Sequence, residues 1–292
     1  MRIRHLVGAT AVTALGLSLT ALPANAAPGG EPGQPEHVST TVIAHRGASA
    51  YAPENTLAAF RVGIDLNATL IESDVQLSKD GVPVLIHDTT LTRTTNVEEV
   101  FPDRASHFVG DYTLDELKQL DAGSWFGEEF AGEQIPTLAE MIEQVRGSRS
   151  GIIMELKSPA LYPGVEQAVS DVFASYPGYV RSALSAGRLS VQSFDWDAME
   201  TYNAISPETP TGLLGTVPVE DMAAYGAWAD EVNPNKNTIT PEYVEAIHAA
   251  GMTTNVYTVN DEPTMHRLLD ADVDGIISDV PDVVFGVLQA RR

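Results

Sequence analysis

The stretch TVIAHRGASAYAPENTLAAFRVGIDLNATLIESD, residues 41–74, shows the structural unit on which this protein is built. Apolar and β-branched residues at 41–45 are typical of a buried strand, and those at 69–74 of a second one. Between them, residues 57–64 repeat their apolar side chains with helical spacing. A strand, a helix and another strand in succession are typical of parallel sheets, in which a helix returns the chain to the other end.

The same alternation of short apolar runs and amphipathic segments continues along the sequence. Repeated units of this kind over residues 40–292 predict an α/β fold, a TIM-type (β/α)8 barrel, as one domain. The candidate strands number nine, one too many for such a barrel, so we expect one of them to lie outside the barrel wall. They are residues 41–45, 69–74, 83–88, 151–156, 189–194, 211–215, 229–233, 253–259 and 275–279.

The sequence contains signals for the first residues of several helices. Residues 113–116 and 137–140 both fit the capping box, in which a threonine and a glutamate satisfy backbone groups reciprocally. Thr240 precedes a proline at the first helical position, and Asn55 or Thr56 can cap the helix of the opening stretch. For the PENT segment we therefore favour capping over a role in a functional site.

The connection after the second strand departs from the regular pattern. Only VQLSKDGV separates Asp74 from Pro83, which is too short for a helix, so this segment is expected to return as extended chain. Residues 89–136 contain no clear strand. They are predicted to form a small insertion after the third strand, on the side where barrel loops build active sites.

Residues 1–26 have the features of a cleaved secretory signal peptide. Arg2 and Arg4 precede an apolar run, and residues 24–26 have the small-x-small form of a signal peptidase site. Residues 27–39 are rich in proline and glycine and are expected to be a flexible lead-in. We therefore expect a secreted, extracellular protein, and no later segment is long and apolar enough to span a membrane.

The composition limits the possible partners. A formal net charge of -23 repels nucleic acid and also opposes anionic substrates. An enzyme that acts on phosphates would need local positive charge from a metal or from the few basic residues. The sequence contains no cysteine, so an exported form uses no disulfides.

Polar residues gather at the carboxyl ends of the predicted strands, which meet at one mouth in a barrel. Two acidic pairs, two histidines and a lysine at such positions are more than a solvated surface would explain. These residues are His45, Arg46, Glu72, Asp74, His87, Asp88, Glu155, Lys157 and Gln192.

The residue types indicate chemistry on phosphates. Glu72, Asp74 and Glu155 would repel one another unless they bound a hard divalent cation, and oxygen ligands suit Ca²⁺ or Mg²⁺ better than zinc. Histidines can pass protons near neutral pH, and arginine or lysine can hold an oxyanion. A metal, two proton carriers and two cations together are typical of a phosphoryl-transfer site.

Several motifs now show a resemblance to a known family. The segments AHRGASAYAPENT, IESDVQLSKDGVPVLIHD, MELKSP, VQSF, VYTVN and DGIISD, in this order, resemble the glycerophosphodiester phosphodiesterase family in its secreted bacterial form. The resemblance covers residues 41 to about 282. It implies a TIM-like barrel that hydrolyses glycerophosphodiesters to glycerol 3-phosphate and an alcohol with a divalent metal.

The resemblance also implies roles for single residues. The family's catalytic histidines fall on His45 and His87, and its phosphate-contacting basic residues fall on Arg46 and Lys157. Its metal carboxylates fall on Glu72, Asp74 and Glu155. The sequence departs from the family at Tyr257, where tryptophan is usual, so the alcohol side of the pocket is expected to differ.

Three interpretations follow from the sequence. The first is a metal-dependent hydrolase of glycerophosphodiesters, and the second is a phospholipase D-like relative that acts on intact lysolipids. The third is a protein that binds phosphodiesters without cleaving them. Two histidines at the mouth argue against a pure binding protein, whereas the choice between the first two depends on the insertion and on access for an acyl chain.

Overall fold

The computed structural model describes residues 40–291, which belong to one compact unit. The predicted signal peptide, residues 1–26, and the predicted lead-in, residues 27–39, lie outside the described residues.

Eight parallel strands form a barrel, as the sequence predicts. Their order around the wall is β7-β6-β5-β4-β2-β1-β9-β8. Parallel bridges between Glu231 and Thr253 and between Asn235 and Tyr257 connect β7 to β8 and close the barrel. The strands are β1 (Thr41–Ala44), β2 (Leu70–Leu77), β4 (Gly151–Leu156), β5 (Leu189–Ser193), β6 (Thr211–Leu214), β7 (Glu231–Asn233), β8 (Asn255–Val256) and β9 (Gly275–Ser278).

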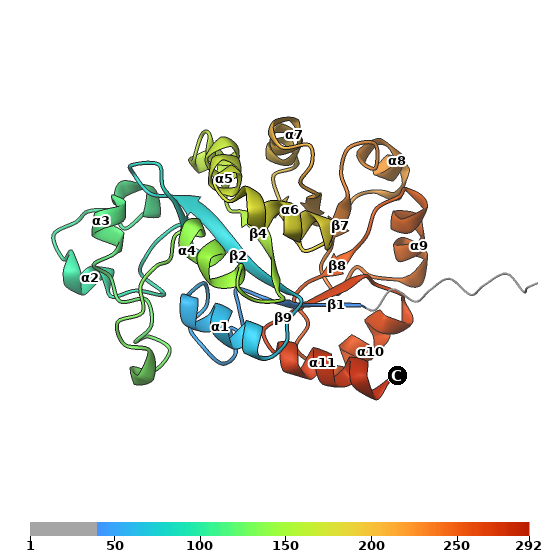
Figure 1. Cartoon of the computed structure of the whole chain (residues 1–292), viewed down its shortest axis with the longest axis horizontal. Coiled ribbons are helices and arrows are strands. Elements are labelled where there is room, and N and C mark those ends of the chain that lie inside the picture. The colour runs from blue at the N-terminus through green and yellow to red at the C-terminus, as the bar shows by residue number, and fades with distance from the viewer. Residues whose placement is uncertain (1–39, 292) are drawn as a thin grey trace, which may run out of the picture. The chain divides into compact units, whose positions relative to one another are not determined.

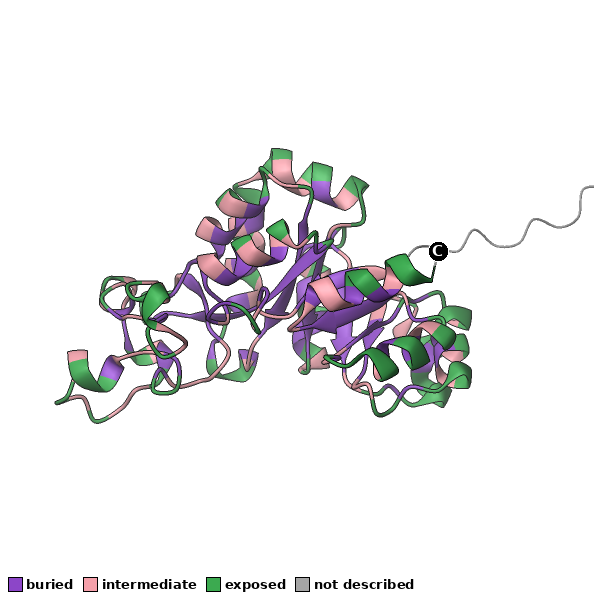
Figure 2. Cartoon of the chain, turned by 90° about the horizontal axis from the view of Figure 1, so that it is seen from below, coloured by how far each residue is buried: buried purple, intermediate pink, exposed green. Residues whose placement is uncertain are grey.

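Helices cover the outside of the wall (Figure 1). Figure 2 shows buried residues along the strands and exposed residues on the outer faces of the helices, as expected for amphipathic helices packed on a sheet. The helices are α1 (Leu57–Asp65), α4 (Leu138–Val145), α5 (Val165–Ala174), α6 (Pro177–Ser185), α7 (Trp196–Ile205), α8 (Met222–Tyr225), α9 (Pro241–Ala249), α10 (Glu262–Asp270) and α11 (Pro281–Ala290).

The predicted helix starts are confirmed. Thr56 caps α1 by accepting a hydrogen bond from the backbone of Ala59. Thr137 forms the full capping box of α4, and Thr240 caps α9 ahead of a proline. Asn55 is not the cap, and its side chain binds Asp74 instead.

The additional strand is β3 (Pro83–Leu85), which pairs antiparallel with β2 and lies outside the barrel wall. The predicted extended return is therefore a hairpin, in which Leu85 pairs with Val75. The strand ends at Leu85 rather than at Asp88, so His87 reaches the mouth of the barrel from the segment after this hairpin.

The predicted insertion at 89–136 contains α2 (Val97–Val100), α3 (Leu114–Leu117) and two single 3₁₀ turns, and Thr113 forms the capping box of α3. It is packed around a small apolar core next to the hairpin, on the left in Figure 1. This core consists of Val84, Ile86, Leu91, Val97, Val109, Tyr112, Leu117, Leu120, Ala122 and Ile135.

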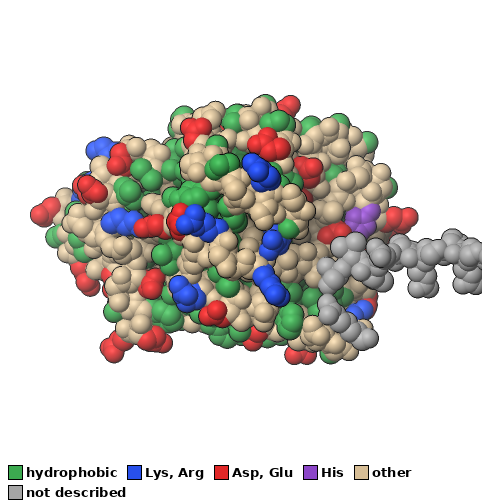
Figure 3. All heavy atoms as spheres, viewed as in Figure 1, with side chains coloured by type: hydrophobic (Ala, Val, Ile, Leu, Met, Phe, Trp, Pro, Cys, Tyr) green, Lys and Arg blue, Asp and Glu red, His purple; other side chains and the backbone are tan. Residues whose placement is uncertain are grey.

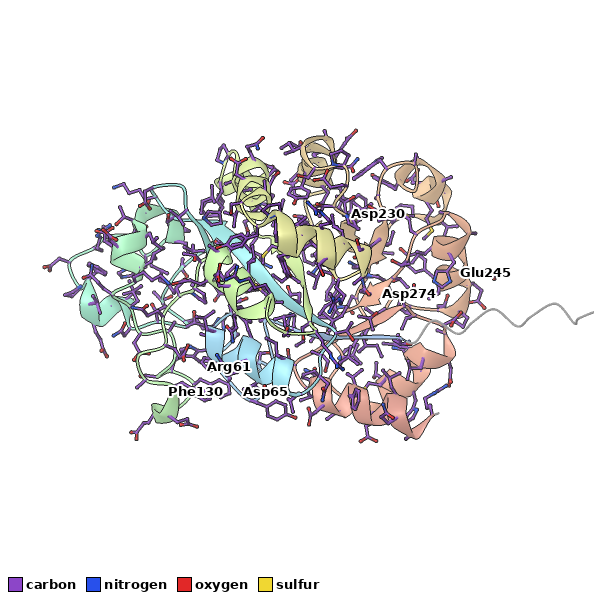
Figure 4. The ribbon with its side chains drawn as sticks, in the orientation of Figure 1. Arg61, Asp65, Phe130, Asp230, Glu245 and Asp274 are labelled. Carbon is purple, nitrogen blue, oxygen red and sulfur yellow. The ribbon has the colours of Figure 1, made fainter. Side chains whose placement is uncertain are left out.

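Two aspartates that precede strands tie the amino ends of the wall together (Figure 4). Asp230 accepts a hydrogen bond from the backbone of Thr211 at 2.8 Å. Asp274 accepts from the backbone of Thr254 at 2.8 Å and lies 2.8 Å from His248 Nε2. On the outside of the molecule, acidic and basic side chains are interspersed over the face seen in Figure 3. Within residues 40–291, no helix has the length and apolar character of a membrane span.

Candidate active site

A cavity of about 300 Å³ lies at the carboxyl ends of the barrel strands. Because each strand of the wall delivers its last residues there, side chains from distant parts of the sequence meet around it. The lining includes His45, Arg46, Glu72, His87, Glu155, Lys157, Gln192, Phe194 and Tyr257.

Three buried carboxylates form a cluster at the cavity. Glu72, Asp74 and Glu155 each offer an oxygen within 4.8 Å of the others. Burial, with repulsion from Asp74 and Glu155, raises the pKa of Glu72 well above its ordinary value. Burial and the Asp74 charge also raise the pKa of Glu155 to about 7. A cluster of oxygen donors under such repulsion fits a hard divalent cation, which would relieve it.

Asp74 is held in place by two neighbours. Asn55 Nδ2 donates to Asp74 Oδ2 at 2.9 Å, and Arg46 Nε lies 3.4 Å from the same oxygen. Burial would raise the pKa of Asp74, but the charges of Arg46, His87 and Lys157 outweigh it and the pKa is lowered. Asp74 is therefore the carboxylate of the cluster that stays ionised most readily.

The turn after β1 brings Arg46 to the cluster. Arg46 has a left-handed backbone with φ 54°, and its N–H donates to Glu72 Oε2 at 2.7 Å. Gly47 follows with φ 81°, and a Cβ there would lie 2.6 Å from the backbone of Ala59. Only glycine fits this second position, because it combines a left-handed backbone with close contact to α1.

His45 is oriented by a carboxylate from the last strand. Its Nδ1 lies 2.6 Å from Asp279 Oδ1. Ser49 and Asn260 also donate to Asp279, and although burial acts against them, these contacts lower the pKa of Asp279 to about 2. An ionised Asp279 can only accept a hydrogen bond, so Nδ1 of His45 carries the proton and donates it, and Nε2 is left for the cavity.

His87 is oriented in the same way by its neighbour in the sequence. Its Nδ1 lies 2.7 Å from Asp88 Oδ1, and Arg93 Nε donates to Asp88 at 2.6 Å. Arg93 also binds Glu54, which in turn accepts from Arg46 Nη1 at 2.9 Å. Burial, assisted by the charge of Arg46, lowers the pKa of His87 in spite of the nearby Asp74. The network therefore connects the two sides of the cavity.

Lys157 supplies a second positive charge. Its Nζ lies 2.8 Å from Glu155 Oε1 and 3.6 Å from Asp74 Oδ1. The next residue, Ser158, has a left-handed backbone with φ 47° and precedes the 3₁₀ turn Pro159–Leu161. Together with Arg46, this lysine offsets part of the negative charge of the cluster.

The structure brings together all seven of the predicted site residues. Six line the cavity, and Asp74 lies directly beside them in the carboxylate cluster. The sequence did not identify the residues that position them, namely Glu54, Asn55, Arg93 and Asp279. For Asp279, a signal was available, since it follows the last strand directly.

Comparison with known proteins relates the chain to one family. Residues 45–283 match the family model described as the glycerophosphoryl diester phosphodiesterase family. A glycerophosphodiester phosphodiesterase of Caldanaerobacter subterraneus is 39% identical over 256 residues, which cover 86% of this chain and 99% of that protein. One from Bacillus subtilis is 32% identical over 290 residues, covering 93% and 94%.

Solved structures give the same result. A phosphodiesterase of Oleispira antarctica, solved in complex with its product sn-glycerol-3-phosphate, superposes with a TM-score of 0.75 at 31% identity. The match covers 85% of this chain and 96% of that protein. A glycerophosphodiester phosphodiesterase from Agrobacterium tumefaciens has a TM-score of 0.67 at 31% identity, over 85% of this chain and 99% of that one.

Proposed function

Because the chain belongs to the glycerophosphoryl diester phosphodiesterase family, we propose that it cleaves glycerophosphodiesters with two histidines as proton carriers and a divalent cation in the carboxylate cluster. The chain is an enzyme, a glycerophosphodiester phosphodiesterase, so the interpretation as a non-catalytic binding protein is set aside. The expected products are glycerol 3-phosphate and an alcohol.

The observation that carries the proposal is the pair of anchored histidines. His45 and His87 each direct Nδ1 to a carboxylate, 2.6 and 2.7 Å away, and both line the cavity. Each therefore has one nitrogen available to a substrate, which is the arrangement that a positioned acid or base requires. A protein that only binds phosphate has no need for such an arrangement.

Glu72, Asp74 and Glu155 would hold the cation, and Ca²⁺ and Mg²⁺ both suit their oxygen atoms. When bound, it would stabilise negative charge on the phosphoryl oxygens. Arg46 and Lys157 neighbour the cluster and would bind the same oxygens as hydrogen-bond donors.

The proton carriers then act in two steps. One histidine takes the proton of the neighbouring glycerol hydroxyl while that oxygen bonds to phosphorus, and the other protonates the alcohol oxygen as its bond to phosphorus breaks. The product of this step is a cyclic phosphate. In the second step the histidines exchange roles, water opens the ring, and glycerol 3-phosphate is released.

The alcohol has room in a neighbouring hollow of about 580 Å³. Phe194 and Lys157 line both this hollow and the cavity, and Trp196 and Tyr225 line the hollow but not the cavity. Phe194 meets Tyr257 edge to face at 5.8 Å, so the departure from the family at Tyr257 affects this side of the site. We infer that the aromatic walls receive the leaving alcohol.

A product assay with glycerophosphocholine tests the function. The enzyme loaded with Ca²⁺ or Mg²⁺ should release glycerol 3-phosphate and choline, and a chelator should stop the release. Lysophosphatidylcholine in a parallel reaction tests the phospholipase D-like interpretation. If the metal-loaded enzyme does not release glycerol 3-phosphate from any glycerophosphodiester, the proposal is wrong.

We also propose that the protein is secreted after removal of residues 1–26. The support is the sequence alone, with Arg2, Arg4 and the small residues at 24–26. N-terminal sequencing of the exported protein should give Ala27 as its first residue. An intact Met1 on exported material would contradict cleavage.

A further inference from the structure

A group of polar side chains crosses the inside of the barrel next to the active-site cavity. Asn233 Nδ2, on β7, donates to Gln192 Oε1, on β5, at 2.9 Å, and to Glu231 Oε2 at 2.9 Å. Asn255 Nδ2, on β8, donates to the same Glu231 oxygen at 3.1 Å. Gln192 and Asn233 are buried, with exposed fractions of 1% and 0%. We call these four residues the amide network.

The barrel wall is shaped to admit this network. Strand β6 lies between β5 and β7, so the contact between Gln192 and Asn233 has to pass over it. Gly212 on β6 leaves the space open, because a Cβ there would lie 2.8 Å from Asn233 Nδ2. Gly275 on β9 does the same for Asn255, whose Oδ1 would lie 2.0 Å from a Cβ.

The network fixes which end of the Gln192 amide faces the cavity. The backbone N–H of Asn255 donates to Asn233 Oδ1 at 2.8 Å, and a backbone N–H can only donate. The oxygen of Asn233 is thereby identified, and its Nδ2 must face Glu231 and Gln192. Since Gln192 receives a donor, it accepts with Oε1, and its Nε2 is left on the other side.

Gln192 Nε2 has no acceptor of its own in the protein. Gln192 lines the cavity together with Arg46 and Lys157, and within residues 40–291 no group accepts a hydrogen bond from its Nε2. The Nε2 atom is therefore a donor that is open to the cavity, where a ligand can supply the acceptor. We propose that Gln192 donates to a non-bridging phosphate oxygen of the substrate, and that Asn233 and Glu231 are positioning residues that lock this donor.

The fixed orientation favours a phosphate oxygen over a glycerol hydroxyl as the acceptor. A hydroxyl can donate or accept, so it would bind either end of a rotating amide. A phosphoryl oxygen can only accept, so only the nitrogen end of Gln192 is useful to it. This inference rests on the proposed phosphodiesterase function and adds a neutral donor to the charged pair Arg46 and Lys157.

An exchange of the two partners tests the inference. In the double variant Glu231→Gln/Asn233→Asp the acid and the amide trade places and the net charge is unchanged. In its ionised form the new carboxylate at position 233 can only accept, so Gln192 must turn its nitrogen inward and present its oxygen to the cavity. The inhibition constant of the product glycerol 3-phosphate should rise about tenfold, the usual effect of losing a hydrogen bond to a charged group.

Gln192→Met provides the matched comparison. Alone it should weaken glycerol 3-phosphate binding to a similar degree, and in the exchanged background it should add no further loss, because both changes remove the same donor. The affinity for Ca²⁺ and the Tm should stay close to those of the parent enzyme. If the exchanged variant does not fold, the inhibition constant of glycerol 3-phosphate for Gln192→Met alone decides whether the inference holds.

Three results would overturn the inference. They are an unchanged inhibition constant, losses that add in the combined variant, and a fall in Ca²⁺ affinity in place of phosphate affinity. The last would mean that Gln192 serves Glu155, its register partner on β4, and not the substrate. If the parent enzyme cleaves glycerophosphocholine but the variants bind glycerol 3-phosphate as tightly as the parent does, this inference is wrong and the proposed function still holds.

Discussion

Arg46, Asn55 and Ser158 have left-handed backbone conformations, with φ of 54°, 57° and 47°. Such conformations cost about 1–3 kcal/mol for residues other than glycine, and they persist only where neighbouring contacts enforce them. Here the contacts are visible, since Arg46 binds Glu72 through its N–H and Asn55 binds Asp74 through its amide. At the scale of single residues, the site is therefore held by hydrogen bonds that override the backbone conformation these residues would otherwise prefer.

The two histidines give the first prediction. His45→Asn or His87→Asn should lower kcat by about 10²–10⁴, the usual contribution of a positioned proton carrier. The Tm should change little, because both side chains lie at the cavity and not in the apolar core. Steady-state kinetics with glycerophosphocholine and a thermal melt of each variant measure the two effects.

His248→Asn is the matched control. His248 also lies beside a carboxylate, Asp274 at 2.8 Å, but at the amino end of the barrel. Its substitution should leave kcat unchanged. A kcat near that of the parent in either active-site variant would exclude the proton-carrier role, and so would a loss of kcat that merely follows unfolding. A change in KM alone would indicate that the histidine binds the substrate.

Asp279 gives a second prediction at this scale. Asp279→Asn removes the ionised acceptor of His45 Nδ1, so the ring loses its fixed tautomer and orientation. We expect kcat to fall by about tenfold or more with KM less affected. An unchanged kcat would show that His45 needs no carboxylate.

The sequence predicted which residues meet at the cavity better than it predicted the residues that position them. His45, Glu72 and Glu155 were identifiable because polar side chains at the ends of apolar strands have few structural explanations. Glu54 and Asn55 were assigned to a helix start, since in a sequence they cannot be distinguished from capping residues. Only the fold shows that Thr56 caps the helix while its two predecessors face the site.

At the scale of secondary structure, the hairpin of β2 and β3 is the largest departure from a regular barrel. The short connection predicted an extended return, and the count of strands predicted one outside the wall. The sequence could not tell which one, because Pro83–Leu85 is as apolar as the strands of the wall. Pairing partners depend on contacts across the sheet and not on local composition.

The insertion gives a prediction with a pH dependence. Asp121 accepts from the backbone of Gly123, Ser124 and Gly132. Burial would raise the pKa of Asp121, but these hydrogen bonds and that of the Ser124 hydroxyl lower it to about 2. Since the unfolded value is about 3.9, ionised Asp121 stabilises the fold fully above pH 4. The contribution is lost as the pH falls toward 2.

Asp121→Asn should therefore lower the Tm at pH 7, and the difference from the parent should narrow between pH 4 and pH 2.5. Thermal melts of both proteins over this range measure it. Asp103→Asn, an exposed change in the same insertion, should show no such narrowing. A constant difference at all pH values would mean that the charge of Asp121 is not involved.

At the scale of the whole molecule, the barrel holds a concentrated negative cluster inside a chain of net charge -23. Among residues 40–291, Arg46 and Lys157 form ion pairs with the cluster of Glu72, Asp74 and Glu155 and offset part of its charge, so a bound metal should stabilise the entire fold. We predict that saturating Ca²⁺ or Mg²⁺ raises the Tm of the chelated protein and restores its activity.

Glu72→Gln should weaken this response by lowering the affinity for the metal, while the variant remains folded. Thermal melts in EDTA and at increasing metal concentration measure both effects. Full activity in a thoroughly chelated sample would contradict a role for the metal. Equal metal-induced shifts in the parent and the variant would place the metal elsewhere.

The overall fold was predictable because eight repetitions of one unit leave little choice of architecture. The closure of the barrel was not, because β7 and β8 are short and meet only through isolated bridges. Residues 253–259 read as a full strand, whereas the structure has β8 only at Asn255–Val256. At this junction the hydrogen bonds of side chains replace part of the backbone ladder.

This junction determines where the backbone should exchange its protons with solvent. Over most of the wall an amide is protected by a carbonyl of the next strand, and it opens only with that pairing. The N–H of Asn255 is protected by the side chain of Asn233 instead. The rate at which this N–H takes up deuterium should thus depend on the position of the Asn233 side chain. Local opening of the barrel should begin where β7 meets β8.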